Sequence, residues 1–157
     1  HTANRRQRQM CIRDSTTGDL ISPWADVKMD VHNIPFEENS FDVVICNHVL
    51  EHVDDSNKVM REFYRVMRPG GWGIFQVPID NNNPNTIEDK SVTDPKQRER
   101  LYWQSDHLRL FGRDYGDRLS KAGFKVTESD YINELDPKLV ERYALPKNEK
   151  VYFCEKI

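Results

Sequence analysis

The 157-residue sequence is poor in cysteine and glycine and has no long apolar run. Its three cysteines, Cys11, Cys46 and Cys154, are widely spaced and form no Cys-x-x-Cys pair. This usage predicts neither a disulfide framework nor a thiolate metal site, and it favours a reducing cytoplasm. No apolar stretch is long enough for a membrane-spanning helix, and no signal-peptide core is present. We therefore expect a cytoplasmic protein with no membrane partner.

Strong net charge is also absent, since the formal charge is -3 and the sequence pI is about 6.0. Nucleic-acid binding needs a clustered positive field, so no nucleic-acid partner is expected. The length suits one domain with one core. The sequence does not specify an oligomeric state.

The first fifteen residues, HTANRRQRQMCIRDS, have no helical or strand period and hold a cluster of arginines. We expect residues 1–15 to be a foreign or disordered segment. An arginine-rich targeting peptide is the alternative, although the segment lacks the apolar face of one. Residues 16–157 are then expected to form the single domain.

The most informative stretch runs from Asp30 to Pro78. An apolar strand over 41–47 is followed by helix-capping residues at 54–56, an amphipathic helix to about residue 67, a Pro-Gly-Gly turn, and a second apolar strand over 72–77. This strand–helix–strand unit places Asn47 and His48 at the carboxyl end of a buried strand. Ligands bind at that edge in open α/β sheets.

The remaining patterns predict short strands over 17–20 and 27–31, and closing strands over 125–131 and 150–155. Helices are expected over 96–103 and 111–121, with a helical turn over 137–143, and a polar loop or lid occupies about 81–105. Alternation of strands and helices predicts an α/β fold. We expect a Rossmann-like, doubly wound, mostly parallel sheet with helices on both faces.

The segments IPFEENSFDVVICNHVLEHV and YRVMRPGG closely resemble the class I S-adenosylmethionine-dependent methyltransferases, in the branch called methyltransferase type 11. The resemblance implies transfer of a methyl group from S-adenosyl-L-methionine, here to an acceptor expected to be a small molecule. That family begins with a strand and a Gly-x-Gly-x-Gly turn, which this sequence lacks. We therefore expect a truncated domain without its first strand and first helix, whose activity the truncation can abolish. A break is expected between the strand near Thr17 and the strand over 41–47.

The resemblance also implies roles for five residues in cofactor binding. Asp19 would accept the ribose hydroxyls, Asp30 and the backbone amide of Val31 would meet the adenine, and Asn47 and His48 would line the methionine end. A plainer interpretation remains open for each of these residues, as a turn or strand-end residue, or for His48 as a packed imidazole.

Three further interpretations concern His107 and the HVLEH segment. His107 is the candidate general base, because the unperturbed pKa of histidine lies near neutrality. His48, Glu51 and His52 match the H-x-x-E-H motif of zinc peptidases. Zinc would need both histidines on one helix, yet His48 follows a strand, so no metal is expected. A domain that only binds, or an inactive one, is the other alternative class.

Overall fold

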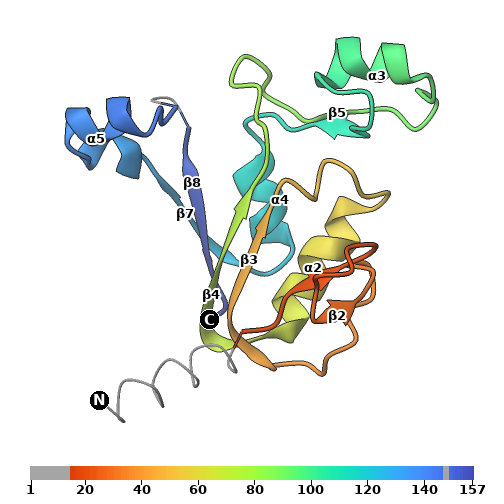
Figure 1. Ribbon diagram of the computed structural model, residues 1–157, viewed down its shortest axis with the longest axis vertical. Helices are drawn as coiled ribbons and strands as arrows, with labels where there is room; N and C mark the ends of the chain where they lie inside the picture. The colour runs from red at the N-terminus through yellow and green to blue at the C-terminus, as the bar shows by residue number, and fades with distance from the viewer. Residues whose placement is uncertain (1–14, 147–148) are drawn as a thin grey trace. The chain divides into compact units, whose positions relative to one another are not determined.

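The computed structural model describes residues 15–146 and 149–157. The chain divides into two compact units, residues 1–35 and residues 36–157, and each is described by itself. The segment predicted to be foreign or disordered, residues 1–15, lies outside the described residues except for its last member. Figure 1 labels the helices and strands.

The N-terminal unit contains two short parallel strands, β1 (Gly18–Asp19) and β2 (Val27–Lys28). The Asp26 carboxylate accepts hydrogen bonds from both the backbone N–H and the hydroxyl of Thr17, at 2.8 and 2.7 Å. These bonds fix the turn that leads into β2. Both strands occur where the sequence predicts them, but each is shorter than expected.

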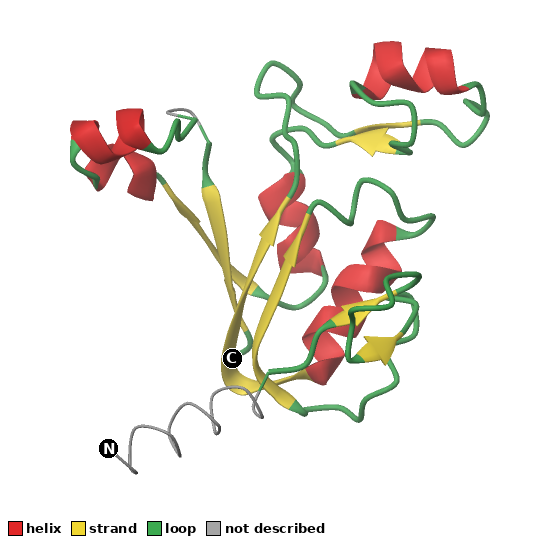
Figure 2. Ribbon diagram, in the orientation of Figure 1, coloured by secondary structure: helices red, strands yellow, loops and turns green. Residues whose placement is uncertain are grey.

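The C-terminal unit is built on a four-stranded sheet in the order β3-β4-β8-β7. These strands are β3 (Phe41–Asn47), β4 (Met67–Gln76), β8 (Val151–Glu155) and β7 (Lys125–Ser129). β3 and β4 run parallel, whereas β8 is antiparallel to both β4 and β7. The sheet with its helices confirms the predicted α/β, Rossmann-like class (Figure 2). The expected mostly parallel pairing is not found in this sheet, because β8 runs antiparallel to both of its neighbours.

Helix α2 (Ser56–Val66) connects the parallel strands β3 and β4, as predicted. Asp55 caps it by accepting a hydrogen bond from the backbone N–H of Lys58 at 2.9 Å. Its buried apolar residues recur at helical spacing, and the Phe63 ring stacks on Phe75 of β4 at 5.0 Å. Burial of this face positions the loop between β3 and α2.

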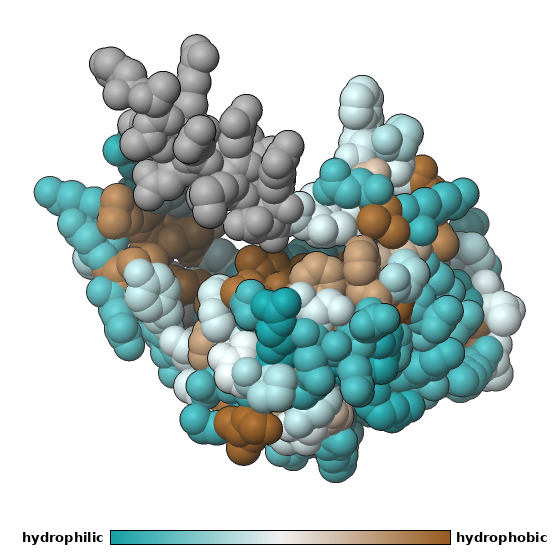
Figure 3. Space-filling view, turned by 90° about the horizontal axis from the view of Figure 1, so that it is seen from below, coloured by the Kyte–Doolittle hydropathy of each residue, from teal (hydrophilic) through white to brown (hydrophobic). Residues whose placement is uncertain are grey.

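Helix α4 (Tyr115–Lys121) packs on the same face of the sheet as α2. The Tyr115 hydroxyl donates to the carbonyl oxygen of Phe75 at 2.9 Å, and its ring lies 4.8 Å from that of Tyr152 on β8. The opposite face carries Val43 and Ile45, whose exposed fractions are 40% and 62%. Both α2 and α4 therefore cover one face, so the prediction of helices on both faces is wrong for the described part of this sheet. Figure 3 shows apolar patches on an otherwise largely hydrophilic surface.

Strand β4 begins at Met67, whereas the sequence predicts this strand to begin at residue 72. The Pro-Gly-Gly segment is therefore part of β4. Phe41 pairs with Met67 and Val43 pairs with Trp72, so the register shifts between them and leaves the turn as a bulge. Gly70 has a φ of 79°, and a Cβ on Gly71 would lie 2.7 Å from the Asp42 carbonyl oxygen. Glycine is therefore required at both positions.

The segment after β4 contains a small antiparallel pair that the sequence did not reveal, β5 (Ile87–Glu88) with β6 (Arg109–Leu110). Helix α3 (Pro95–Tyr102), which the sequence predicts over 96–103, lies between them and is capped by Asp94. Helix α4 begins four residues later than predicted, because Phe111 forms a bridge with Ile79 instead. A 3-10 helix, η1 (Tyr131–Glu134), and α5 (Pro137–Arg142) precede β8.

The sequence predicts a break in the sheet before β3. In the described ranges β1 and β3 belong to separate sheets, and β3 is an edge strand with β4 as its only hydrogen-bonded neighbour. Backbone groups along this edge of β3 therefore lack the strand partner that a central position would give them. In the same ranges no helix is long and apolar enough to cross a membrane.

Candidate functional site

Asn47 and His48 lie at the carboxyl end of β3, as predicted, and both are exposed. His48 adopts a φ of 56°, while its backbone N–H donates to the Gln76 carbonyl oxygen at 2.8 Å. A positive φ is unfavourable for a residue with a Cβ, so this conformation turns the chain sharply at the strand end. The turn keeps both side chains out of the core. Their roles in cofactor binding stay a prediction.

A pocket of about 290 Å³ adjoins His48. Its wall includes the residues that follow β4, among them Val77 and Pro78, together with Trp103, Lys150 and Tyr152. Ligands of α/β sheets bind beyond the carboxyl ends of parallel strands, and this pocket occupies that place in the C-terminal unit.

Asp19, Asp30 and Val31 belong to the N-terminal unit. The Oδ1 atom of Asp19 accepts hydrogen bonds from the backbone N–H groups of Ile21 and Ser22 at 2.8 and 2.7 Å. These bonds lower the pKa of the Asp19 carboxyl group, so it is ionised at neutral pH. Asp30 accepts a hydrogen bond from the backbone N–H of His32 at 2.8 Å. Both carboxylates are exposed at or just beyond the ends of short strands.

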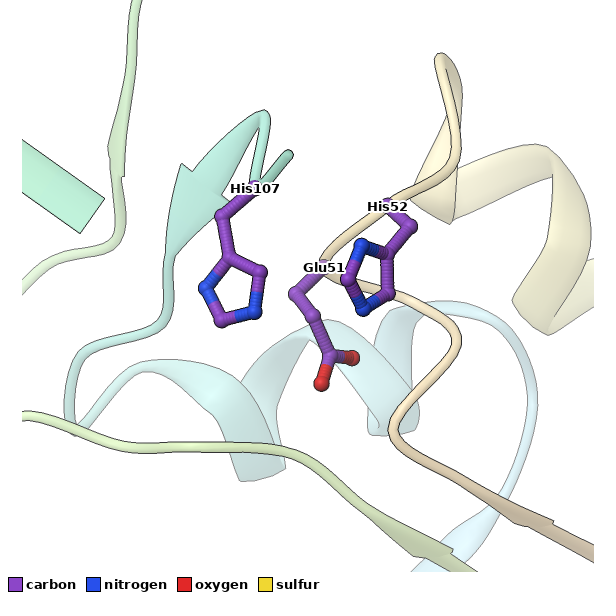
Figure 4. A group of neighbouring side chains, drawn as sticks. All are labelled: Glu51, His52 and His107. Atoms are coloured by element: carbon purple, nitrogen blue, oxygen red, sulfur yellow. The ribbon is translucent and has the colours of Figure 1, made fainter. Parts of the chain in front are cut away.

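A second group of polar side chains, Glu51, His52 and His107, meets behind the turn that follows β3. One ligand atom from each lies within 4.8 Å of the others (Figure 4). Glu51 and His107 are each 1% exposed, whereas 34% of the His52 side chain is exposed. The sequence shows Glu51 and His52 as part of the H-x-x-E-H match and does not connect them to His107. No local pattern marks that contact, because it joins segments far apart in the chain.

The helical zinc-peptidase geometry is not present. Helix α2 begins only at Ser56, so His48 and His52 both precede it and do not share a helix. The Nδ1 atom of His48 instead lies 3.3 Å from the Oε1 atom of Glu51. This separates the observed cluster from the H-x-x-E-H interpretation of the sequence.

Arg109 on β6 holds the two halves of this cluster together. Its buried guanidinium donates to the carbonyl oxygens of Leu50 at 2.6 Å, of Val53, and of Asp54 at 3.1 Å. It also forms a 2.8 Å ion pair with Glu88 of β5.

A backbone hydrogen bond of 2.8 Å, from the N–H of Leu108 to the carbonyl oxygen of Glu51, adds a further link. The backbone segments that carry Glu51 and His107 are therefore held together by hydrogen bonds.

Comparison with known proteins shows a similarity to methyltransferases. A family model described as a methyltransferase domain matches residues 6–75. The chain is 30% identical over 148 residues to the sterol 24-C-methyltransferase of Schizosaccharomyces pombe, covering 90% of this chain and 37% of that protein. It is 36% identical over 67 residues to a ubiquinone biosynthesis O-methyltransferase of Bordetella avium, covering 39% and 27%. The chain thus spans less than two fifths of these relatives.

Solved structures agree on the fold. A 1,6-didemethyltoxoflavin-N1-methyltransferase of Burkholderia thailandensis, solved with S-adenosylhomocysteine, gives a TM-score of 0.60 at 15% identity, covering 96% of this chain and 66% of that one. The [4+2]-cyclase SpnF gives 0.54 at 15% identity, covering 83% and 56%. A cyclase among the neighbours shows that this fold alone does not define a reaction. The sequence relatives and the family model therefore show that this chain is similar to methyltransferases over residues 6–75 and beyond.

Proposed function

We propose that this chain binds S-adenosylmethionine at the carboxyl end of β3 and serves the transfer of its methyl group to a small-molecule acceptor. The observation that carries the proposal is the exposed pair Asn47 and His48, which ends β3 beside a pocket of about 290 Å³. A strand end that packed into the core would leave no place for a cofactor there.

The residues present fit the chemistry of the cofactor. An ionised carboxylate can accept hydrogen bonds from a pair of hydroxyl groups. The pKa of Asp19 is lowered, and both backbone N–H groups that bond to its carboxylate donate to the Oδ1 atom. We assign Asp19 to the ribose. Asp30 and the Val31 amide offer an acceptor beside a donor, which matches the edge of adenine, and Asn47 and His48 would line the methionine end.

The cofactor supplies an activated methyl group on a sulfonium, which leaves as a neutral thioether. The protein therefore has to hold donor and acceptor in line and keep water out, which is catalysis by orientation. The rigid end of β3, fixed by the bond from His48 N–H to Gln76, suits that task. His107 as a general base stays a prediction. It is buried, and its Nδ1 bonds to the Tyr102 carbonyl oxygen at 2.8 Å, so only Nε2 would take a proton.

The acceptor is proposed only as a class. Names among the relatives include a sterol, a ubiquinone-pathway and an arsenite methyltransferase, which share small acceptors but no common chemistry. The mainly apolar contribution of Val77, Pro78 and Trp103 to the pocket beside His48 suits an acceptor with an apolar part.

Calorimetric titration with S-adenosylhomocysteine tests the proposal. We expect saturable binding that Asp30→Asn weakens about tenfold or more, because the carboxylate loses its charge-assisted bond worth about 1.5–3 kcal/mol. Asp42→Asn is the matched control, since Asp42 is an exposed carboxylate on β3 paired with Arg68. Absence of binding by the folded chain, or equal loss in both variants, would contradict the proposal.

A further inference from the structure

Glu51 is a buried carboxylate with an unsatisfied oxygen. The residue is 1% exposed, its Oε1 atom contacts His48 Nδ1 at 3.3 Å, and its Oε2 atom has no hydrogen-bond partner among the described residues. Burying an anion without full compensation is costly, and native proteins rarely leave such an atom unpaired. The orphaned Oε2 atom therefore points to a group that the protein holds at this place.

The two imidazoles beside Glu51 present their ring nitrogens to it (Figure 4). His107 Nδ1 bonds to the carbonyl oxygen of Tyr102 at 2.8 Å, so Nδ1 carries the proton. His52 Nδ1 lies 3.3 Å from Asp106 Oδ2, which favours a proton on that nitrogen as well. In both rings the Nε2 atom is left to face the cluster. Two ring nitrogens and a carboxylate directed at one another suit a shared cation.

The geometry suits a metal ion after a small contraction. Ligand atoms at about 2.0–2.1 Å from a tetrahedral zinc lie roughly 3.3 Å apart. Here they lie within 4.8 Å of one another. The contacts of Arg109 and Leu108 hold the segments that carry Glu51 and His107, whereas His52 is partly exposed.

We propose that Glu51, His52 and His107 bind a divalent transition-metal ion, with zinc as the reference ion. Two histidines and a carboxylate form a three-residue set that leaves a fourth position open for an oxygen ligand. The hydrogen bond of His107 Nδ1 with Tyr102 and the 3.3 Å contact of His52 Nδ1 with Asp106 are outer contacts of the kind that orient metal-binding histidines. His107 acts here as a ligand in place of the predicted base. His48, which contacts Glu51 and lines the neighbouring pocket, connects the metal site to that pocket.

Zinc titration of chelator-treated full chain tests the proposal, with cobalt substitution as a spectroscopic readout. We expect one zinc per chain and a visible d–d absorption band from four-coordinate cobalt. Glu51→Gln and His52→Gln each remove a ligand and should weaken zinc binding at least about 100-fold, whereas Asp106→Asn should weaken it about 10–100-fold. His32→Gln, a histidine change in the N-terminal unit, should leave the affinity unchanged.

Substoichiometric zinc in the folded wild-type chain would overturn the proposal, as would wild-type affinity in Glu51→Gln. Circular dichroism shows whether the variants fold. Should the Glu51 variant unfold, the exposed His52→Gln change and the cobalt spectrum of the wild-type chain decide the question instead. Titration of the same samples with S-adenosylhomocysteine measures the proposed function separately, so either idea can fail without the other.

Discussion

Arg109 should be a major source of stability in the C-terminal unit. It is 1% exposed and donates to three backbone carbonyl oxygens of the turn after β3, as well as to Glu88. Charge-assisted hydrogen bonds contribute about 1.5–3 kcal/mol each, so simple addition over four bonds gives roughly 6–12 kcal/mol. Removing the side chain also removes its own desolvation cost. Measured losses for breaking buried ion pairs are about 3–5 kcal/mol, and we expect Arg109→Ala to fall in that range.

Urea unfolding followed by tryptophan fluorescence measures this loss. Arg68→Ala is the matched control, because Arg68 pairs with Asp42 at 2.9 Å while both side chains are at least half exposed. Exposed pairs contribute about 0–1 kcal/mol. Arg109→Lys should lie between the two, since one ammonium keeps the charge but does not span the same acceptors. Equal losses in Arg109→Ala and Arg68→Ala would refute the claim that Arg109 braces the turn.

Three further predictions concern the core and the helix cap. Phe63→Ala should lower the free energy of unfolding by about 3–5 kcal/mol, because the ring is buried against Phe75; a loss under about 1 kcal/mol in urea unfolding would contradict the packing. Asp55→Ala should cost about 1 kcal/mol at pH 7. The hydrogen bond from Lys58 N–H lowers the pKa of Asp55, so its stabilisation is present above the unfolded pKa of about 3.9 and disappears as the pH falls through the lower folded value. A loss of equal size at pH 7 and pH 2 would count against that cap. Burial raises the pKa of Cys154 to about 12, so peptide mass spectrometry should find its alkylation at pH 8 slow in the native chain and fast in urea; rapid native alkylation would be inconsistent with a buried thiol.

The sequence alone predicts the elements whose signals are local. The apolar run over 41–47 gave the exact bounds of β3, and the capping aspartate with its helical spacing gave α2 to within two residues. The methyltransferase motifs lie in these elements. The positions of Asn47 and His48 at the end of β3 could be predicted for the same reason, because a strand end is a local feature.

Features that depend on distant contacts could not be predicted. Arg109 and His107 belong to a segment whose composition is typical of a solvated loop. The Arg109 side chain is nevertheless buried, because its guanidinium donates hydrogen bonds to carbonyl oxygens of the turn over residues 50–54. Helix α4 starts later than the sequence predicts, because Phe111 forms a β-bridge with Ile79. This tertiary contact overrides the helical spacing of the sequence. The group of Glu51, His52 and His107 follows from these contacts and has no sequence signature of its own.

Nuclear magnetic resonance with methyl-¹³C-labelled S-adenosylmethionine tests the central claim most directly, because the labelled carbon is the reacting atom. At saturating cofactor we expect nuclear Overhauser contacts from the labelled methyl group to protons of Asn47 and His48. Contacts confined to other parts of the chain would contradict the placement of the donor at the end of β3, and so would the absence of any bound methyl signal from the folded protein.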